Sequence, residues 1–387
     1  MNVMRTVELF AGIGGFRIAA DRLGWETVWA NDSSEKACIV YHDRFGPKEL
    51  HQGDFTELKA VVPDHDVLTG GFPCQPFSSA GKKEGTRDAR GTLFELIVDV
   101  LKMRRPKFFV LENVKRLLTM ENGGHFATIL GSLAELDYAL EWRLLNAMHF
   151  GLPQNRERVV ILGVRKTREQ LDPRIRLALP EDFSTIKGRQ RDRLAEPATW
   201  NTIPEHKARF PDWGLASAGR FFGLDLEKFT TACPLVRLAA VLQDTVPAEF
   251  DFTEATLKWA HENDPVNRFI HGVEILSNQR GGARMGYTIF GTNGVAPTLT
   301  STTSRHYERY KIGERYRRLT NIEYARIQGF PDEHCKAVSV YDQYQLFGNA
   351  VPPPLVEWVL SRLSDDGITR HALPRRKEPA TLFDDAN

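Results

Sequence analysis

A thiol, Cys74, stands in the sequence where an apolar strand gives way to a loop. The strand is expected over Asp66 to Thr69, and Gly70, Gly71 and Pro73 then interrupt any regular ladder. In an open parallel α/β sheet, ligands and chemistry lie beyond the carboxyl ends of the strands. A lone cysteine is more often a small buried hydrophobe, but a packed strand would not carry so many backbone breakers. We therefore expect Cys74 to react as a nucleophile.

An acid and two arginines could act with this thiol. Glu112 follows the strand expected over Lys107 to Leu111, and the apolar residues before it favour a half-buried carboxyl over a surface ion pair. Arg156 and Arg158 precede the strand expected over Val159 to Val164. Two residues apart on an extended chain, they point the same way and suit an anionic or carbonyl-rich ligand. The alternative is a solvated edge.

A glycine turn near the start of the chain predicts a nucleotide-type site. A strand is expected over Thr6 to Phe10 and a helix over Phe16 to Leu23, with Gly12 and Gly14 between them. Glycines permit a tight turn and close backbone approach, and the helix start offers free N–H groups. The spacing differs from GxGxxG, so a dinucleotide is not specified.

Two acids follow the next strands. Asp32 ends the strand expected over Glu26 to Ala30, about 20 residues beyond the glycine turn, where an acid can hold a ribose hydroxyl. The alternative for Asp32 is to cap the helix that starts near Ser34. Asp54 could accept a hydrogen bond from an adenine amino group or merely cap a turn.

The strands and helices alternate up to about Val164, which predicts an α/β fold with a doubly wound parallel sheet. The residues from 167 to 293 show no clear periodicity, and no fold is assigned to them. Three segments are locally basic, and the last carries interleaved tyrosines that suit phosphate contact and base stacking: Ile186 to Leu194, Gln279 to Arg284 and Arg305 to Arg318. A solvated charged face is the competing interpretation.

Composition narrows the class of protein. The chain has 387 residues, a net charge of +1 and 42% hydrophobic residues, as in ordinary globular proteins. Its four cysteines lack CxxC spacing, so we expect neither a disulfide framework nor a metal site, and a reducing cytoplasm fits. We expect no signal peptide and no membrane-spanning segment.

Taken together, these stretches resemble the DNA cytosine-5 methyltransferases. The motifs that carry the resemblance run in the family's order from Glu8 to about Leu355: ELFAGIGGF, the acid after VWAN, GDF, GGFPCQPFS, RGTLF, FFVLENV, QNRERV, APTLT, RLTNIEYARIQGFP and GNAVPPPL. The stretch of about 130 residues before APTLT occupies the place of the family's target-recognition region. The compact layout resembles bacterial modification enzymes.

The resemblance implies a cofactor, S-adenosyl-L-methionine, and a domain plan. Residues 1–175, completed by 340–365, would form the catalytic and cofactor-binding domain, 176–339 a smaller target-recognition domain, and 366–387 a loose tail. Asp32 would hold the ribose and Asp54 the adenine. The full expected cofactor site is Phe10, Gly12, Gly14, Asp32, Asp54, Phe55, Pro73, Leu93 and Asn349.

The resemblance also implies the reaction. The Cys74 thiolate would add to C6 of a flipped-out cytosine, a protonated Glu112 would donate to N3, and Arg156 and Arg158 would hold the base carbonyl and the active-site carboxylate. The loop from Ser78 to Arg90 would close over the base. The residues expected to contact double-stranded DNA are Gln75, Ser78, Arg280, Arg284, Arg305 and Arg309. A monomer that works beside a separate restriction endonuclease is expected.

Two alternatives stay open from the sequence. One is an RNA cytosine-5 methyltransferase acting on transfer RNA with the same catalytic motifs, against which the long insert before APTLT argues. The other is a catalytically inactive DNA-binding protein, against which the intact PCQ, ENV and QNRER motifs argue.

Overall fold

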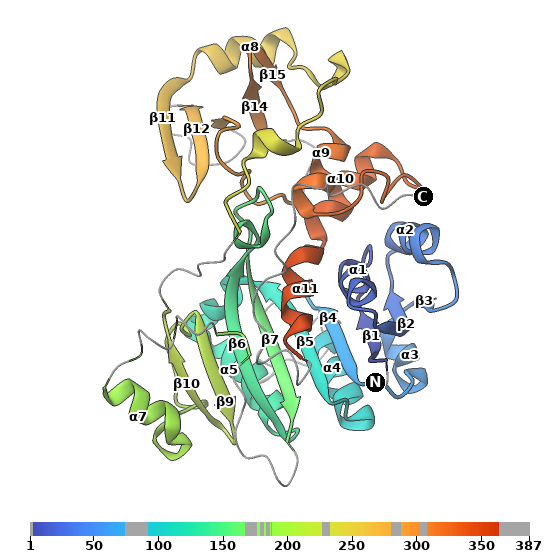
Figure 1. The fold of residues 1–387 in the computed structure, drawn as a ribbon, viewed down its shortest axis with the longest axis vertical. Coiled ribbons are helices and arrows are strands. Elements are labelled where there is room, and N and C mark those ends of the chain that lie inside the picture. Colours follow the sequence, from blue (N-terminus) through green and yellow to red (C-terminus); the bar gives the residue numbers. More distant parts are fainter. Residues whose placement is uncertain are drawn as a thin grey trace, which may run out of the picture.

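The fold is described from a computed structural model. It describes residues 3–73, 92–166, 176–178, 182, 186, 188–226, 233–279, 288–301 and 308–363. Within these ranges the chain forms a ten-stranded sheet and a separate five-stranded sheet, with helices around and between them (Figure 1). No helix in the described ranges is long and apolar enough to span a membrane.

The first sheet begins as the sequence predicts. Its first five strands are parallel and lie in the order β3-β2-β1-β4-β5. Their bounds are β1 Arg5–Leu9, β2 Glu26–Asp32, β3 Leu50–Gln52, β4 Val67–Gly71 and β5 Phe108–Val114. The register aligns their ends, because Leu9 pairs with Asn31 on one side and Gly70 on the other, and Gly70 pairs with Leu111. Residues just beyond these ends therefore meet at one edge.

The sheet is doubly wound, as predicted, but it is mixed and not wholly parallel, because the strands beyond β5 pair antiparallel. Strand β7, Glu157–Arg165, runs antiparallel to β5, and β6, Tyr138–Asn146, runs antiparallel to β7. The physical reason is the short connection between β6 and β7, since antiparallel strands can be joined by a short turn whereas parallel strands need a crossover. The mixed sheet remains doubly wound, with helices on both faces.

Alternating side chains of the strands bury both faces of this sheet. On one face, Leu68, Phe109 and Leu111 pack in the core with α3, α4 and α5. On the other, Val67 and Val110 pack with α1 and with α11 from the far end of the chain. The helices of this part are α1 Gly15–Arg22, α2 Glu35–Phe45, α3 Phe55–Leu58, α4 Thr92–Arg104, α5 Gly124–Ala134 and α11 Pro353–Ser361.

Part of the region without an assigned fold also joins the first sheet. Strand β9, Trp213–Ser217, pairs antiparallel with β6, and is followed by β10, Arg220–Leu224, and β8, Asn201–Thr202. Buried Trp142 and Trp213 fill this end of the sheet. Helix α7, Arg189–Ala195, lies beside it. Short 3-10 helices connect the longer elements. In chain order they are Lys59–Val61, Lys115–Leu118, Met120–Gly123, Ala147–Phe150, Pro197–Thr199, Leu238–Val241 and Ala248–Phe250.

The second sheet has the order β11-β12-β13-β14-β15. Its strands are β11 Asp264–Ile270, β12 Val273–Asn278, β13 Thr288–Phe290, β14 Arg309–Ile312 and β15 Arg315–Arg317, and the neighbouring helices are α8 Glu254–His261, α9 Asn321–Gln328 and α10 Val340–Asn349. We call its apolar interior the second core, which includes Val273, Phe290, Tyr310, Tyr324, Phe330 and Phe347. The stretch 176–339 thus contributes to both sheets, and the domain boundaries stay a prediction.

The residues at both ends of helix α9 explain where it begins and ends. Thr320 accepts from the Glu323 backbone N–H, and the Glu323 side chain accepts from the Thr320 backbone N–H, which is the capping box that the spacing predicts. Gly329 ends the helix in a left-handed conformation at φ 81°. Figure 1 shows α10 and α11 running from this part of the molecule down to the first sheet.

The contact between α1 and the segment before α11 generates a stability prediction. A Cβ on Gly15 would lie 2.3 Å from the Val351 carbonyl oxygen, whereas a Cβ on Gly131 in α5 would meet nothing within 4 Å. Gly15→Ala should therefore lower the free energy of unfolding by about 1–3 kcal/mol, and Gly131→Ala, the matched control, should raise it by about 0.5–1 kcal/mol. Chemical denaturation measures both, and equal effects of the two changes would contradict the packing described.

Candidate active site

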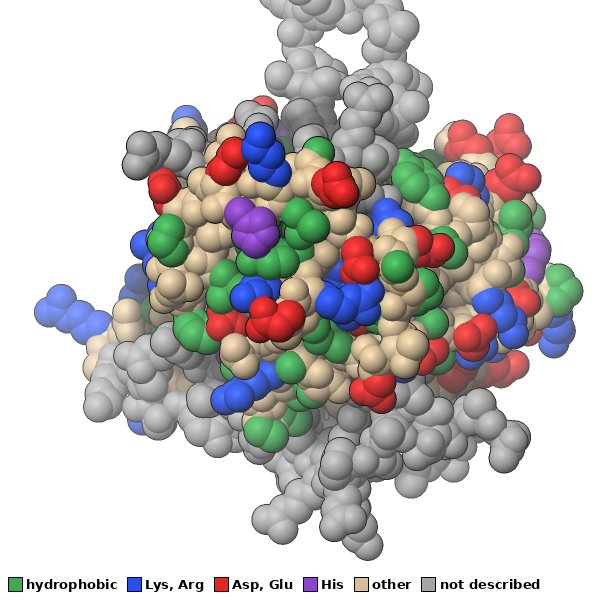
Figure 2. All heavy atoms as spheres, turned by 90° about the horizontal axis from the view of Figure 1, so that it is seen from above, with side chains coloured by type: hydrophobic (Ala, Val, Ile, Leu, Met, Phe, Trp, Pro, Cys, Tyr) green, Lys and Arg blue, Asp and Glu red, His purple; other side chains and the backbone are tan. Residues whose placement is uncertain are grey.

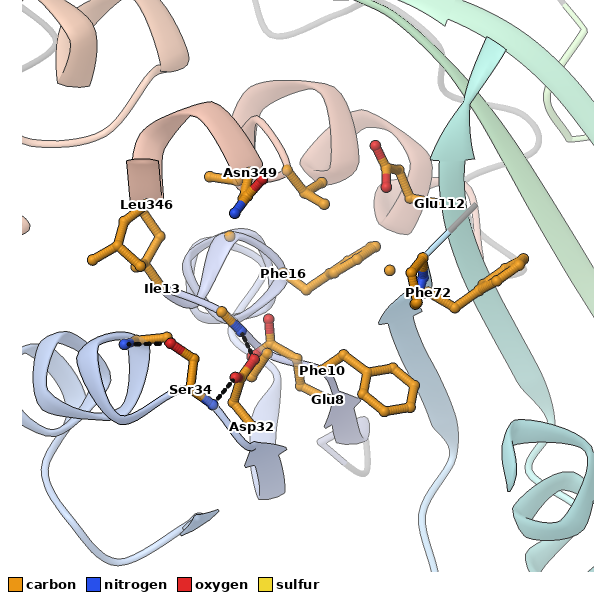
Figure 3. Close-up of a pocket in the computed structure, with 18 of the residues that line it drawn as sticks. Glu8, Phe10, Ile13, Phe16, Asp32, Ser34, Phe72, Glu112, Leu346 and Asn349 are labelled. Carbon is orange, nitrogen blue, oxygen red and sulfur yellow. Dashed lines mark hydrogen bonds between the residues drawn. The ribbon is translucent and has the colours of Figure 1, made fainter. Parts of the chain in front are cut away.

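A cavity of about 450 Å³ opens at the carboxyl ends of β1, β2, β4 and β5. The glycine turn and α1 form its floor, and the end of α10 with Ala350 and Val351 forms its roof (Figure 3). Asp32 lies at one end, and Glu112 with Arg158 at the other. Its size falls within the range of about 300–1,000 Å³ that is usual for small-molecule sites.

The glycine turn is held in an unusual backbone conformation. Phe10, Gly12 and Gly14 have φ angles of 55°, 56° and 80°, in the left-handed region. The Ala11 N–H donates to the Asn31 carbonyl at 2.8 Å, and the Gly14 N–H donates to the Ala11 carbonyl at 2.9 Å. A phenylalanine rarely adopts a left-handed conformation, so its presence at the cavity wall marks a functional constraint.

Asp32 lines the cavity and ties the turn to β2. One carboxylate oxygen accepts from the Gly12 N–H at 2.7 Å and the other from the Ser34 N–H at 2.8 Å. Ser34 caps α2, since its side chain accepts from the Ala37 N–H, so Asp32 is not the helix cap. Burial raises the pKa of Asp32, and these backbone hydrogen bonds oppose the rise.

Other residues expected at the cofactor lie away from the cavity. Asp54 is exposed and caps α3 by accepting from the Thr56 N–H at 2.8 Å, which is the turn-capping alternative, and that bond lowers its pKa. Phe55 is buried behind Phe10, with ring centroids 5.6 Å apart. Leu93 packs against the same core. Of the expected cofactor residues, Phe10, Gly12, Asp32, Pro73 and Asn349 line the cavity, whereas Gly14, Asp54, Phe55 and Leu93 do not.

Glu112 and Arg158 form a buried ion pair at the other end of the cavity. The Arg158 Nε lies 2.8 Å from Glu112 Oε1, and each side chain is 11% exposed. Burial lowers the pKa of Arg158, and the charge and hydrogen bond of Glu112 oppose the change. Glu112 pairs with Gly71 in the β4–β5 register. The Glu112 carboxylate and the Arg158 guanidinium therefore lie beside the end of β4.

Arg156 is 1% exposed and bonds to backbone carbonyls. Its Nη1 donates to Leu299, and its Nη2 donates to Gly348 and Ala350, at 2.9 to 3.0 Å. Burial lowers its pKa, but a guanidinium stays charged at neutral pH. Arg156 also lines the cavity, and its Nε has no hydrogen-bond partner among the described residues.

The thiol follows the cavity wall directly in the chain. Pro73 lines the cavity, and the Asn113 side chain donates to the carbonyl of the residue before it, Phe72, at 2.8 Å. Cys74 is the next residue. Cys74, Gln75 and Ser78 lie outside the described residues, as do Arg280, Arg284 and Arg305.

In the basic segment Arg305 to Arg318, several of the described residues, which begin at 308, form contacts inside the protein. Tyr310 is fully buried, Arg317 forms a buried ion pair with Glu323, and Arg315 pairs with Asp251. Arg309 lies over the ring of Trp259, 4.5 Å from its centroid. Where described residues form the face in Figure 2, acidic and basic side chains are interspersed, so we find no single basic patch there.

Glu8, which was not predicted at the site, lines the cavity at 2% exposure. Tyr41 Oη donates to its Oε2 at 3.3 Å, and its Oε1 has no partner among the described residues. Burial raises the pKa of Glu8 to about 8, although the bond from Tyr41 and the charge of Arg17 lower it. An acid inside the apolar strand before the glycine turn was the available signal. Ile13, Phe16, Asn113, Leu346 and Val351 also line the cavity and were not predicted.

Comparisons with known proteins point to one family. The family model described as C-5 cytosine-specific DNA methylase matches residues 4–365. The Type II methyltransferase M1.ScrFI of Lactococcus lactis subsp. cremoris is 32% identical over 370 residues, which cover 93% of this chain and 77% of that protein. The Type II methyltransferase M.HhaI of Haemophilus parahaemolyticus is 30% identical over 360 residues, covering 92% and 93%.

Solved structures resemble the fold. The crystal structure of the S. pombe Dnmt2 methyltransferase aligns over 92% of this chain and 97% of its own, with a TM-score of 0.61 and 18% identity. A putative DNA modification methyltransferase encoded within an E. coli prophage aligns over 93% and 98%, with a TM-score of 0.54 and 21% identity. At these identities the likeness concerns the fold alone.

The buried carboxyl of Glu8 predicts a pH dependence of stability. Its pKa of about 8 in the folded protein exceeds the ordinary 4.5, so the folded chain keeps a proton that the unfolded chain releases. The stability that this proton contributes is full below about pH 4.5 and is lost as the pH rises to about 8. Glu8→Gln is neutral throughout, so its free energy of unfolding relative to wild type should increase by about 3–4 kcal/mol from pH 5 to pH 8.

Denaturation at several pH values measures this difference. The control is Glu26→Gln, which removes an exposed carboxyl at the start of β2 and should leave the pH slope as in wild type. If the free energies of unfolding of Glu8→Gln and wild type changed in parallel with pH, Glu8 would have the same pKa in the folded and unfolded chain, which would contradict the prediction.

Proposed function

Because the chain belongs to the C-5 cytosine-specific DNA methylases, we propose that it methylates C5 of a flipped-out cytosine within a specific duplex DNA sequence. The methyl donor is S-adenosylmethionine. The observation that supports this most is a single cavity with a glycine turn and Asp32 at one end and Glu112 with Arg158 at the other. Pro73, on the wall between them, directly precedes Cys74.

The residues of the first end fit the proposed donor. Asp32 offers carboxylate oxygens to ribose hydroxyls, and the glycine turn lets the backbone approach a ligand closely. Phe10 and Asn349 offer an aromatic ring and an amide on opposite walls (Figure 3). The adenine is assigned to this cavity without Asp54, which is exposed on α3. When bound, S-adenosylmethionine supplies an electrophilic methyl group on a sulfonium centre.

The residues of the second end fit activation of cytosine. Ring C5 is a poor nucleophile, and addition of the Cys74 thiolate to C6 makes it enamine-like. Glu112, once it carries a proton, donates to N3 and offsets the developing charge. Arg158 holds the Glu112 carboxyl in place and is assigned to the base carbonyl as well. After methylation, C5 loses its proton to water, N3 returns its proton to Glu112, and the sulfur–C6 bond breaks to regenerate the thiolate.

Arg156 has a different part in this scheme than the sequence suggests. Its two terminal nitrogens are occupied by three backbone carbonyls. We therefore assign it to holding the cavity roof, and we leave the base carbonyl to Arg158.

Sequence reading is assigned to the second sheet and the segments around it. Arg280 and Arg284 are of a type that makes bidentate contacts to guanine in the major groove. Arg309 and Arg305 are assigned to phosphates, which position DNA without reading it. In keeping with the Type II names of its relatives, we place the chain in a restriction–modification system, as a monomer beside a separate endonuclease.

The experiment that tests this function is transfer of a labelled methyl group. The protein is incubated with labelled S-adenosylmethionine and either duplex DNA or transfer RNA. Label in C5 of cytosine in DNA alone is the expected result. Label in transfer RNA alone would establish an RNA methyltransferase, and DNA binding without transfer would establish an inactive DNA-binding protein.

The covalent mechanism predicts how replacing the sulfur of Cys74 by oxygen changes the rate of methyl transfer. Cys74→Ser replaces the thiol by a far weaker nucleophile at neutral pH, so methyl transfer should fall by about 10⁴-fold or more while DNA binding changes little. The control is Cys233→Ser, because Cys233 is a partly exposed thiol that does not line the cavity. It should keep wild-type activity. Normal turnover by Cys74→Ser would rule out the thiol as the nucleophile.

A further inference from the structure

One residue of the glycine turn belongs to the second core. Ile13 lines the cavity and is 2% exposed. Its side chain packs in the cluster that contains Phe330, Cys335 and Phe347, all from the region of α9 and α10. The turn that forms the cavity floor is thus packed against the region of α9 and α10 as well as joined to the first sheet.

The backbone of Ile13 is held by the same region. The imidazole of His334, in the segment between α9 and α10, lies with its Nε2 2.7 Å from the Ile13 carbonyl oxygen. A carbonyl can only accept, so Nε2 carries the hydrogen and donates it. His334 is 0% exposed, and its Nδ1 has no partner among the described residues.

The surroundings of His334 keep the ring neutral and fixed. The rings of Phe330 and Phe45 lie 4.7 and 6.1 Å from it, on the sides of α9 and α2. Burial lowers the pKa of His334 to about 4, so at neutral pH it stays in the form that donates from Nε2. The contact is therefore a neutral hydrogen bond with a set direction.

This bond completes the restraints on the turn. The Ala11 and Gly12 N–H groups bind Asn31 and Asp32, both at the end of β2. Helix α1 first uses the carbonyl of Gly14, which accepts from the Ile18 N–H. The Ile13 carbonyl lies outside that ladder, and the bond from His334, in the segment between α9 and α10, restrains it.

We propose that His334 is a positioning residue for the cofactor, whose donation to the Ile13 carbonyl holds the glycine turn in its binding geometry. The inference rests on the proposed function, because it takes S-adenosylmethionine as the ligand of this cavity. It makes cofactor affinity depend on the segment between α9 and α10, which is remote in sequence from the turn. The alternative role for His334 is to fill space in the second core.

Three variants distinguish a role of His334 as hydrogen-bond donor from a role in filling space in the second core. His334→Phe keeps a ring of similar size and removes the donor. His334→Gln keeps an amide N–H at nearly the reach of Nε2, whereas His334→Asn is one methylene too short. The matched control is His65→Phe, because His65 is a buried imidazole that bonds a backbone carbonyl, Pro63, at 2.8 Å outside the cavity lining.

Calorimetric titration with S-adenosylmethionine, together with methylation kinetics, provides the readout. His334→Phe should raise the Kd and the KM for S-adenosylmethionine about tenfold while kcat at saturation stays within about twofold, because a lost buried hydrogen bond is worth roughly a factor of ten. His334→Gln should recover most of the affinity. His65→Phe should bind as wild type does, even where its thermal stability falls.

The outcomes that overturn the proposal are distinct from failure of the proposed function. Wild-type affinity in His334→Phe, or equally weak binding by the Phe and Gln variants, would leave His334 as a space-filling residue. Where His334→Phe does not fold, Gln and Asn decide, since equal affinities of those two variants would also overturn it. Absence of binding to the wild-type protein would instead refute the assignment of the cofactor.

Discussion

The buried guanidinium of Arg156 is the contact on which the site depends. It joins the start of β7 to Leu299 and to the end of α10, across separations of 143 to 194 residues. Burying a charge is costly unless polar groups surround it, and three backbone carbonyls offset that cost here. The same junction is too tight for a side chain, since a Cβ on Gly348 would lie 2.3 Å from the Thr300 carbonyl oxygen. Asn349 and Val351 reach the cavity because this junction holds them there.

Charge is arranged along the cavity rather than spread around it. Asp32 and Glu8 lie near the glycine turn, and Glu112 and Arg158 lie near the end of β4. Asp32 at the first end offers carboxylate oxygens as acceptors to hydroxyl groups, whereas the ion pair at the second end fixes the Glu112 carboxyl beside Pro73, the residue that precedes the thiol. Strands β1 and β4 lie between β2, which carries Asp32 at the proposed cofactor end, and β5, which carries Glu112 at the proposed catalytic end.

The sequence predicts the parts of the site that depend on local patterns, such as a strand followed by a turn and a helix. The glycine turn, Asp32 at the end of β2 and Glu112 two residues before the end of β5 follow from periodicity and from the rule that parallel strands share a carboxyl edge. The capping box of α9 is likewise local. Contacts between distant segments could not be predicted in this way. The carbonyl partners of Arg156, the hydrogen bond from His334 and the pairing of β9 with β6 depend on tertiary packing that no local pattern encodes. Asp54 shows the converse, because the structure shows the capping role that its local sequence equally allowed.

The proposal that the end of the cavity near Glu112 and Arg158 activates cytosine through a covalent bond to Cys74 is tested most directly by trapping the covalent adduct. Duplex DNA with 5-fluorocytosine at the target position is incubated with the protein and S-adenosylmethionine, and the product is digested and mapped by mass spectrometry. Fluorine cannot leave C5 as a proton does, so the account predicts a stable adduct that joins Cys74 to C6 of a methylated ring. Full methyl transfer to ordinary DNA by the same preparation, with no adduct on Cys74, would contradict it.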